Sequence, residues 1–229
     1  MSTSTFGCRG GWTARVLRAA MTLLFVPVTS CGSETAPDIP QQPANQQACL
    51  TGAVFGELAN SPYCLPWAEG ETYAVGQSYC SPPPGSHQTR YAYDFLMPLG
   101  TEIRNVRAGE VVELREQYAD DDRTGGHENM LSLRHDDETI SIYMHLRYQG
   151  VAVSMGDWVP QGALLGWSGN TGDPAGIPHL HFQICLRSGL CSYTTQEITL
   201  PVNFRNAEGS FTAAGGLALG ERYTAAVCR

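Results

Sequence analysis

The stretch PHLHFQI, residues 178–184, decides the fold class and indicates the chemistry of this chain. Successive side chains of a β-strand point to opposite faces, so Leu180, Phe182 and Ile184 would share one face. His179 and His181 would share the other. The apolar face is typical of a half-buried strand, whereas two imidazoles on one face are hard to explain by packing alone. We therefore expect a strand with one core face and one chemical face.

The segment YAYDF, residues 91–95, alternates in the same way. It predicts a strand in which Asp94 faces away from Tyr93 and Phe95. Taken alone, Asp94 is better explained as a solvated carboxylate on a strand than as a functional group, because charged residues normally lie at the surface.

A third strand is predicted for ISIYMH, residues 140–145. The alternation places Ile140, Ile142 and Met144 on its core face. Tyr143 and His145 then belong to the opposite, chemical face.

The three segments together contain the residues of a zinc hydrolase site. A zinc hydrolase needs three protein ligands and one open position, which His87, Asp94 and His181 would supply with two nitrogens and one oxygen. His145 and His179 are then left to take or deliver protons, because imidazoles titrate near neutral pH. The sequence therefore predicts one zinc ion and a catalytic pair of histidines. It does not indicate which histidine of the pair is the general base.

Other catalytic motifs are absent from the sequence. His127-Glu128 is not followed by a second histidine at the spacing of a His-Glu-x-x-His helix, and no Gly-x-Ser-x-Gly elbow occurs. We expect His127 to be solvated in a polar loop, where it could also line a substrate groove. His135 precedes a turn and is expected to be structural.

The order of these blocks resembles that of the lysostaphin-type, or LytM-type, zinc metalloendopeptidases. The resemblance runs from about residue 65 to residue 206. The matching blocks are GSH at 85–87, YDF at 93–95, MPLGT at 97–101, AGEVV at 108–112, RHD at 134–136, YMHL at 143–146, VSMGD at 153–157, GWSGNTG at 166–172 and PHLHF at 178–182.

The resemblance implies an all-β fold, an antiparallel sheet sandwich of the duplicated hybrid motif type with zinc at the floor of a groove. It implies that His87, Asp94 and His181 bind the zinc and that His145 and His179 are catalytic. The spacing of seven from His87 to Asp94 exceeds the four of many relatives, which we interpret as a loop insertion. The implied activity is hydrolysis of peptide bonds in peptidoglycan stems or cross-bridges.

A second function is compatible with the same resemblance. Some LytM-type relatives have lost zinc, bind the cell wall and regulate separate amidases. Such loss usually removes ligands, and all five site residues are present here, which favours the enzyme over the silent regulatory lipoprotein.

The N-terminal region predicts export. Three arginines precede the apolar run 19–28, as in a secretory signal peptide, assigned to residues 1–30. The segment VTSC, residues 28–31, resembles a bacterial lipobox, so Cys31 would carry a lipid that anchors the protein to the membrane. The alternative is an ordinary signal peptide with Cys31 incidental. The expected location is the cell envelope, in the periplasm or on the outer membrane if the host is Gram-negative.

The rest of the chain divides into two parts. Residues 31–48 are rich in Pro, Gln, Asn and Ala and predict a disordered, lipid-anchored tether. Residues 49–229 predict the metallopeptidase domain, in which short alternating segments and turn residues dominate and helical periodicity is scarce.

Cysteine number supports the lipoprotein interpretation. Once the signal peptide is removed and Cys31 is acylated, an even six cysteines remain, as expected in an oxidising compartment: Cys49, Cys64, Cys80, Cys185, Cys191 and Cys228. We predict a Cys185–Cys191 disulfide across a short turn. The other four can pair in three ways, with Cys228 expected to tie the C-terminal tail to the body of the domain.

Charge excludes one class of partner. The whole chain carries a formal charge of −8, and loss of residues 1–30 removes three arginines and no acidic residue, which leaves −11. An acidic domain of this kind is a poor nucleic-acid binder. We expect a monomer that engages a peptide substrate through its groove. Five aromatic residues could line this groove or pack in the core: Tyr73, Tyr79, Tyr143, Trp158 and Trp167.

Overall fold

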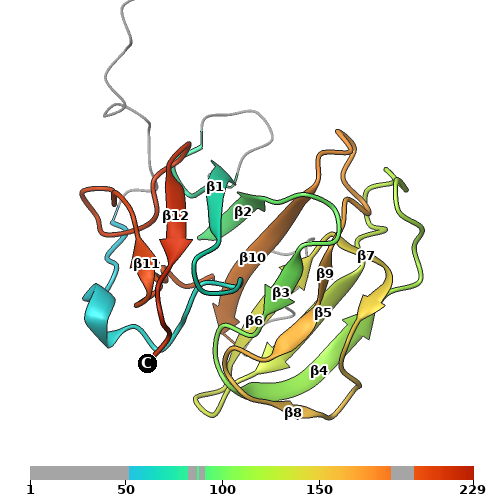
Figure 1. Ribbon diagram of the computed structural model, residues 1–229, viewed down its shortest axis with the longest axis horizontal. Coiled ribbons are helices and arrows are strands. Elements are labelled where there is room, and N and C mark those ends of the chain that lie inside the picture. The colour runs from blue at the N-terminus through green and yellow to red at the C-terminus, as the bar shows by residue number, and fades with distance from the viewer. Residues whose placement is uncertain (1–51, 82–86, 88–90, 187–198) are drawn as a thin grey trace, which may run out of the picture. The chain divides into compact units, whose positions relative to one another are not determined.

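A computed structural model describes residues 52–81, 87, 91–186 and 199–229 (Figure 1). These residues fall within one compact unit, Pro43–Arg229. The predicted signal peptide, the tether and Cys31 lie outside the described residues. Within the part that is described, no helix is long and apolar enough to cross a membrane.

The regular secondary structure of the described residues is almost entirely β-strand. The strands are β1 Thr72–Gln77, β2 Ala92–Leu96, β3 Glu102–Arg104, β4 Gly109–Arg115, β5 Met130–Arg134, β6 Thr139–Met144, β7 Leu146–Val151, β8 Trp158–Val159, β9 Leu164–Ser168, β10 His179–Leu186, β11 Ala207–Glu208 and β12 Arg222–Ala225. One 3₁₀ turn, η1 Leu58–Asn60, precedes them. The prediction of an all-β fold is confirmed.

The strands form two antiparallel sheets. Nine strands follow the order β11-β12-β1-β2-β10-β6-β5-β4-β8, and β3-β9-β7 form a smaller sheet. β10 therefore lies between β2 and β6, with β2, β6 and β10 side by side in Figure 1. One hydrophobic core contains residues of both sheets, including Phe182 of the larger and Leu165 of the smaller. Burial of apolar side chains between the two sheets is thus the main force that holds them together.

The core face of β10 is the one predicted. Leu180, Phe182 and Ile184 are fully buried. The Phe182 ring lies 5.4 Å from the Tyr143 ring and 5.6 Å from the Phe204 ring, measured between centroids. Aromatic contacts of this kind stabilise a core beyond the area that they bury.

The predicted face assignment for residues 140–145 was wrong. Met144 pairs with His181 in the sheet, so Ile142 and Met144 lie on the chemical face of β10. Tyr143 is fully buried in the main core instead. Its hydroxyl accepts a hydrogen bond from the Val106 amide at 3.0 Å and donates to Asn105 Oδ1 at 3.2 Å. A satisfied hydroxyl makes the burial of a tyrosine favourable, and alternation alone could not distinguish two apolar faces.

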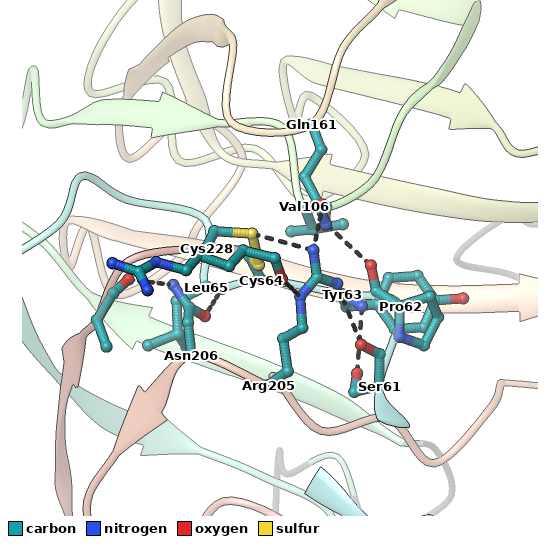
Figure 2. The surroundings of a disulfide bond; sticks show 12 residues. Ser61, Pro62, Tyr63, Cys64, Leu65, Val106, Gln161, Arg205, Asn206 and Cys228 are labelled. Atoms are coloured by element: carbon teal, nitrogen blue, oxygen red, sulfur yellow. Dashed lines mark hydrogen bonds between the residues drawn. A yellow bond between two sulfur atoms is a disulfide. The ribbon is translucent and has the colours of Figure 1, made fainter. Parts of the chain in front are cut away.

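A disulfide ties the C-terminal tail to the body of the domain, as predicted. Cys64 is bonded to Cys228 with 6.0 Å between their Cα atoms (Figure 2). Arg205 strengthens the same junction, because it donates to the Arg229 carbonyl, the Ser61 carbonyl and Gln161 Oε1. The tail is therefore fixed by a covalent bond and by the hydrogen bond that the Arg205 guanidinium donates to the Arg229 carbonyl.

Two other cysteines are described. Cys80 also takes part in a disulfide, and Cys185 is buried at the chemical face of β10. Cys191 lies outside the described residues, so the Cys185–Cys191 bond stays a prediction.

Candidate metal centre and catalytic histidines

Asp94 and His181 face each other across two neighbouring strands. They are directly paired in the antiparallel register of β2 and β10, and directly paired residues point to the same face. His181 Nδ1 lies 3.0 Å from Asp94 Oδ1. Both side chains are buried, at 1% and 5% exposure, so Asp94 is not the solvated carboxylate that its sequence context also allowed.

His87 completes this cluster from outside the strands. Its Nε2 lies 2.9 Å from Asp94 Oδ1, and its ring centroid lies 4.8 Å from that of His181. Although it is so close to the carboxylate, His87 Nε2 is buried and makes no hydrogen bond of acceptable geometry. A buried nitrogen lone pair in this position is costly unless a ligand satisfies it.

The three groups fit a metal ion. One ligand atom from each of His87, Asp94 and His181 lies within 4.8 Å of the others. Two imidazole nitrogens and one carboxylate oxygen are typical ligands of a zinc site that keeps a position open. The structure therefore brings together the three residues that the sequence predicted as ligands.

The electrostatics of the cluster favour an ionised carboxylate. Burial by itself raises the pKa of Asp94, but the imidazoles of His87 and His181 lower that pKa well below its ordinary value. An anionic Asp94 is the form that binds a cation.

Gln183 orients His181 and was missed in the sequence. It lies two residues further along β10, on the same face, and its Oε1 is 3.1 Å from His181 Nε2. An amide oxygen only accepts hydrogen bonds, so Nε2 donates to Gln183, and Nδ1 is the nitrogen on the Asp94 side that a metal ion would bind. Outer hydrogen bonds of this kind fix the ring of a metal-binding histidine. The alternation of β10 already placed Gln183 on this face.

His145 and His179 lie beside the cluster and close to each other. Their ring centroids are 4.4 Å apart, and both side chains are buried. His179 Nε2 lies 3.9 Å from Asp94 Oδ1. The structure thus brings the predicted catalytic pair to the rim of the candidate metal centre.

Each of these two rings donates from Nδ1 to a backbone carbonyl. His145 donates to the Thr171 carbonyl at 2.6 Å, and His179 to the Ile177 carbonyl at 2.7 Å. In a neutral imidazole with a proton on Nδ1, the Nε2 lone pair remains available. Burial, together with the neighbouring His179 and His181, lowers the pKa of His145 to about 3, so its ring is neutral at neutral pH.

His145 does not continue the alternation of β6. It follows the last residue of that strand and has φ +63°, in the left-handed region. This conformation turns its side chain toward His179, although Tyr143, two residues earlier, lies in the core on the opposite face. Left-handed backbone is rare outside glycine and is often found at functional sites.

The two remaining histidines lie in other surroundings. His127 stacks on Tyr118, with 4.2 Å between ring centroids, and its Nδ1 lies 2.9 Å from Asp122 Oδ2. His135 Nδ1 donates to the Ala108 carbonyl at 2.9 Å, and burial lowers the pKa of His135. Its burial agrees with the structural role expected for His135.

Most of the aromatic residues considered for a groove belong elsewhere. Tyr79 and Tyr143 are buried in the core, so the core-packing alternative holds for both. Tyr73 packs against the same core and is partly buried. Trp158, on β8, is 60% exposed, and Trp167, on β9, is partly buried.

Comparison with known proteins places this site in a peptidase context. Residues 88–191 match the sequence profile of peptidase family M23. The matched range contains Asp94, His145, His179 and His181 and begins one residue after His87. The assignment of His87 therefore depends on the geometry of the site.

Two curated proteins and one solved structure are similar to this chain. Lysostaphin of Staphylococcus staphylolyticus is 34% identical over 145 residues, which cover 63% of this chain and 28% of that protein. The peptidoglycan DD-endopeptidase ShyA of Vibrio cholerae is 35% identical over 95 residues, or 41% of this chain and 20% of that protein. The structure of the catalytic domain of lysostaphin from Staphylococcus simulans is 30% identical and covers 56% of this chain and 86% of that domain, with a TM-score of 0.41. The chain thus spans less than a third of the length of these two curated relatives.

Proposed function

The chain belongs to peptidase family M23, as its motifs predicted, and we propose that it is an exported zinc metalloendopeptidase that hydrolyses peptide bonds in peptidoglycan. The observation that carries the proposal is the convergence of five side chains. Three form a metal cluster, and two further imidazoles, those of His145 and His179, lie beside it. The similarity to a peptidoglycan DD-endopeptidase supports the substrate class.

The geometry of the side chains supports the following roles. His87, Asp94 and His181 would hold one zinc ion, which supplies Lewis acidity that activates water and polarises a scissile carbonyl. His145 and His179 would each present Nε2 toward the open side of the cluster. One ring can accept a proton at this atom, and a protonated ring can stabilise a developing oxyanion or protonate the leaving amine.

The test is a paired measurement of zinc and cleavage on the purified chain. Zinc per chain is measured by elemental mass spectrometry, and fragments released from purified peptidoglycan are identified by mass spectrometry. Two substrates are compared, one cross-linked through glycine bridges and one cross-linked directly from D-alanine to diaminopimelate. We expect about one zinc per chain, as in the sites that use three protein ligands, together with new peptide termini that identify the bond.

The alternative function gives a different result in the same assay. A chain that binds peptidoglycan, releases no fragments and increases the activity of a separate amidase would be the regulatory lipoprotein. A chain without zinc at neutral pH would contradict the metal assignment.

Export and lipid anchoring are part of the proposal and depend on the sequence of residues 1–31. Cells grown with a palmitate analogue should label the wild-type chain and not a Cys31→Ser variant. Export of an unlabelled wild-type chain into the medium would instead support an ordinary signal peptide. Light scattering on the purified chain tests the expected monomer.

A further inference from the structure

The left-handed backbone of His145 requires support from outside β6. A non-glycine residue adopts this conformation only when the surrounding structure determines it. The support comes from two other segments, the end of the loop that leads into β5 and the segment Gly169–Gly172 after β9.

Thr171 is the residue at which these contacts meet. It is fully buried, and its carbonyl accepts the hydrogen bond of His145 Nδ1. Its hydroxyl donates to the Leu146 carbonyl at 2.9 Å and accepts from the Asn129 amide at 3.0 Å. The Leu146 amide donates to the Asn129 carbonyl at 3.1 Å. One threonine therefore holds the ring of His145 and also both segments that fix its backbone.

Asn129 extends this support to a second loop. Its side-chain amide donates to the Tyr118 carbonyl at 2.8 Å, and its Oδ1 accepts from the Tyr118 amide at 3.0 Å. Asn129 is itself fully buried. Because every one of these polar groups has a partner, the arrangement has little freedom to shift.

The same short segment also contacts His179. Gly169 forms a β-bridge with His179, whose amide donates to the Gly169 carbonyl at 3.3 Å. A side chain at Gly169 would collide with the backbone, because an added Cβ would lie 2.5 Å from the Arg147 amide nitrogen. Gly169 therefore packs closely against the backbone that follows His145 and is also bridged to His179. Both histidines are thus placed relative to the same short segment.

We propose that Thr171 is a positioning residue for His145 and that the segment Gly169–Gly172 sets the separation of the two imidazoles. The proposal rests on the proposed function, because only in a peptidase does the 4.4 Å separation of the His145 and His179 rings matter for catalysis. Thr171 does not touch the metal cluster, and its removal should leave the cluster intact.

The test compares Thr171→Val with Thr171→Ser in the full chain. Valine keeps the volume and removes the hydroxyl, which leaves the Asn129 amide and the Leu146 carbonyl unpaired. Serine keeps the hydroxyl and should retain activity. We expect Thr171→Val to lower kcat at least about tenfold, since a displacement near 1 Å can cost about a hundredfold. KM and zinc per chain should stay unchanged.

Thr212 supplies a matched control. Its hydroxyl also donates to one backbone carbonyl and accepts from one backbone amide, both of Gly216, and it accepts a further hydrogen bond from the Tyr79 hydroxyl. Thr212→Val should lower the unfolding midpoint as Thr171→Val does and leave kcat unchanged. Equal kcat losses in both variants would overturn the proposal, because they would reflect general destabilisation.

A second measurement does not need peptidase activity. In a ¹H–¹⁵N spectrum of the zinc-loaded wild-type chain, His145 should show a proton on Nδ1 that exchanges slowly with water. Thr171→Val should speed this exchange, and Thr171→Ser should not. If the chain binds zinc but cuts no peptidoglycan, the proposed function fails and the spectrum still decides the role of Thr171. A wild-type His145 that is protonated on Nε2, or an unchanged spectrum in folded Thr171→Val, would overturn the proposal.

Discussion

The candidate metal cluster and the predicted catalytic pair are held in different ways. Asp94 and His181 lie in regular strands and face each other through the register of β2 and β10. His145 lies just past β6 in a left-handed conformation and depends on Thr171 from another part of the chain. Strand pairing alone can thus bring two candidate metal ligands together, whereas the imidazole of His145 needs a loop with its own hydrogen bonds.

Removal of a metal ligand should have the largest effect. Asp94→Ala and His181→Ala should each lose zinc and all activity above background, because two protein ligands do not form a stable site of this type. Zinc per chain and release of peptidoglycan fragments measure the two effects. If the Asp94→Ala chain kept about one zinc, Asp94 would not be a zinc ligand.

Removal of His145 should greatly slow catalysis without affecting zinc binding. His145→Ala should keep its zinc and lower kcat by about 100- to 10,000-fold, the usual contribution of general acid–base catalysis. His127→Ala is the control, because His127 pairs with Asp122 and stacks on Tyr118, which are not among the five site residues. Full activity in His145→Ala would show that His145 is not a catalytic residue.

Gln183 tests how rigidly the metal cluster is held. Gln183→Leu removes the acceptor of His181 Nε2 and should weaken zinc affinity by about 10- to 100-fold. Activity should return at saturating zinc, because the three ligands remain. Competition with a zinc chelator measures the affinity. If activity fell at unchanged zinc affinity, Gln183 would act on the substrate instead.

The disulfide of the C-terminal tail should have the smallest effect on the site. Loss of the bond in the Cys64→Ser, Cys228→Ser double variant should lower the free energy of unfolding by about 2–5 kcal/mol, as measured with denaturant. The tail lies in neither the metal cluster nor the catalytic pair. Zinc content and kcat of the folded protein are therefore expected to match the wild type, and a lower zinc content would show that the two regions are coupled.

Some of this structure could be predicted from local pattern. The two faces of β10 and the position of Asp94 opposite Phe95 follow from alternation of side chains. The pattern failed in β6, where both faces are apolar and Tyr143 enters the core through its bonds with Asn105 and Val106. It also could not predict the left-handed turn at His145, because no neighbour in sequence enforces that turn.

The sequence by itself determined the all-β class, the resemblance to the family, the five candidate side chains of the site and the chemical face of β10. These depend on residue type and on a period of two, and both are local properties. Only the tertiary structure decided that Met144 lies beside His181, that Cys228 pairs with Cys64 and that Thr171 holds His145. These contacts join segments that are distant in the chain. They therefore depend on how the two sheets pack and on which buried polar groups find partners. No short stretch of sequence contains that information.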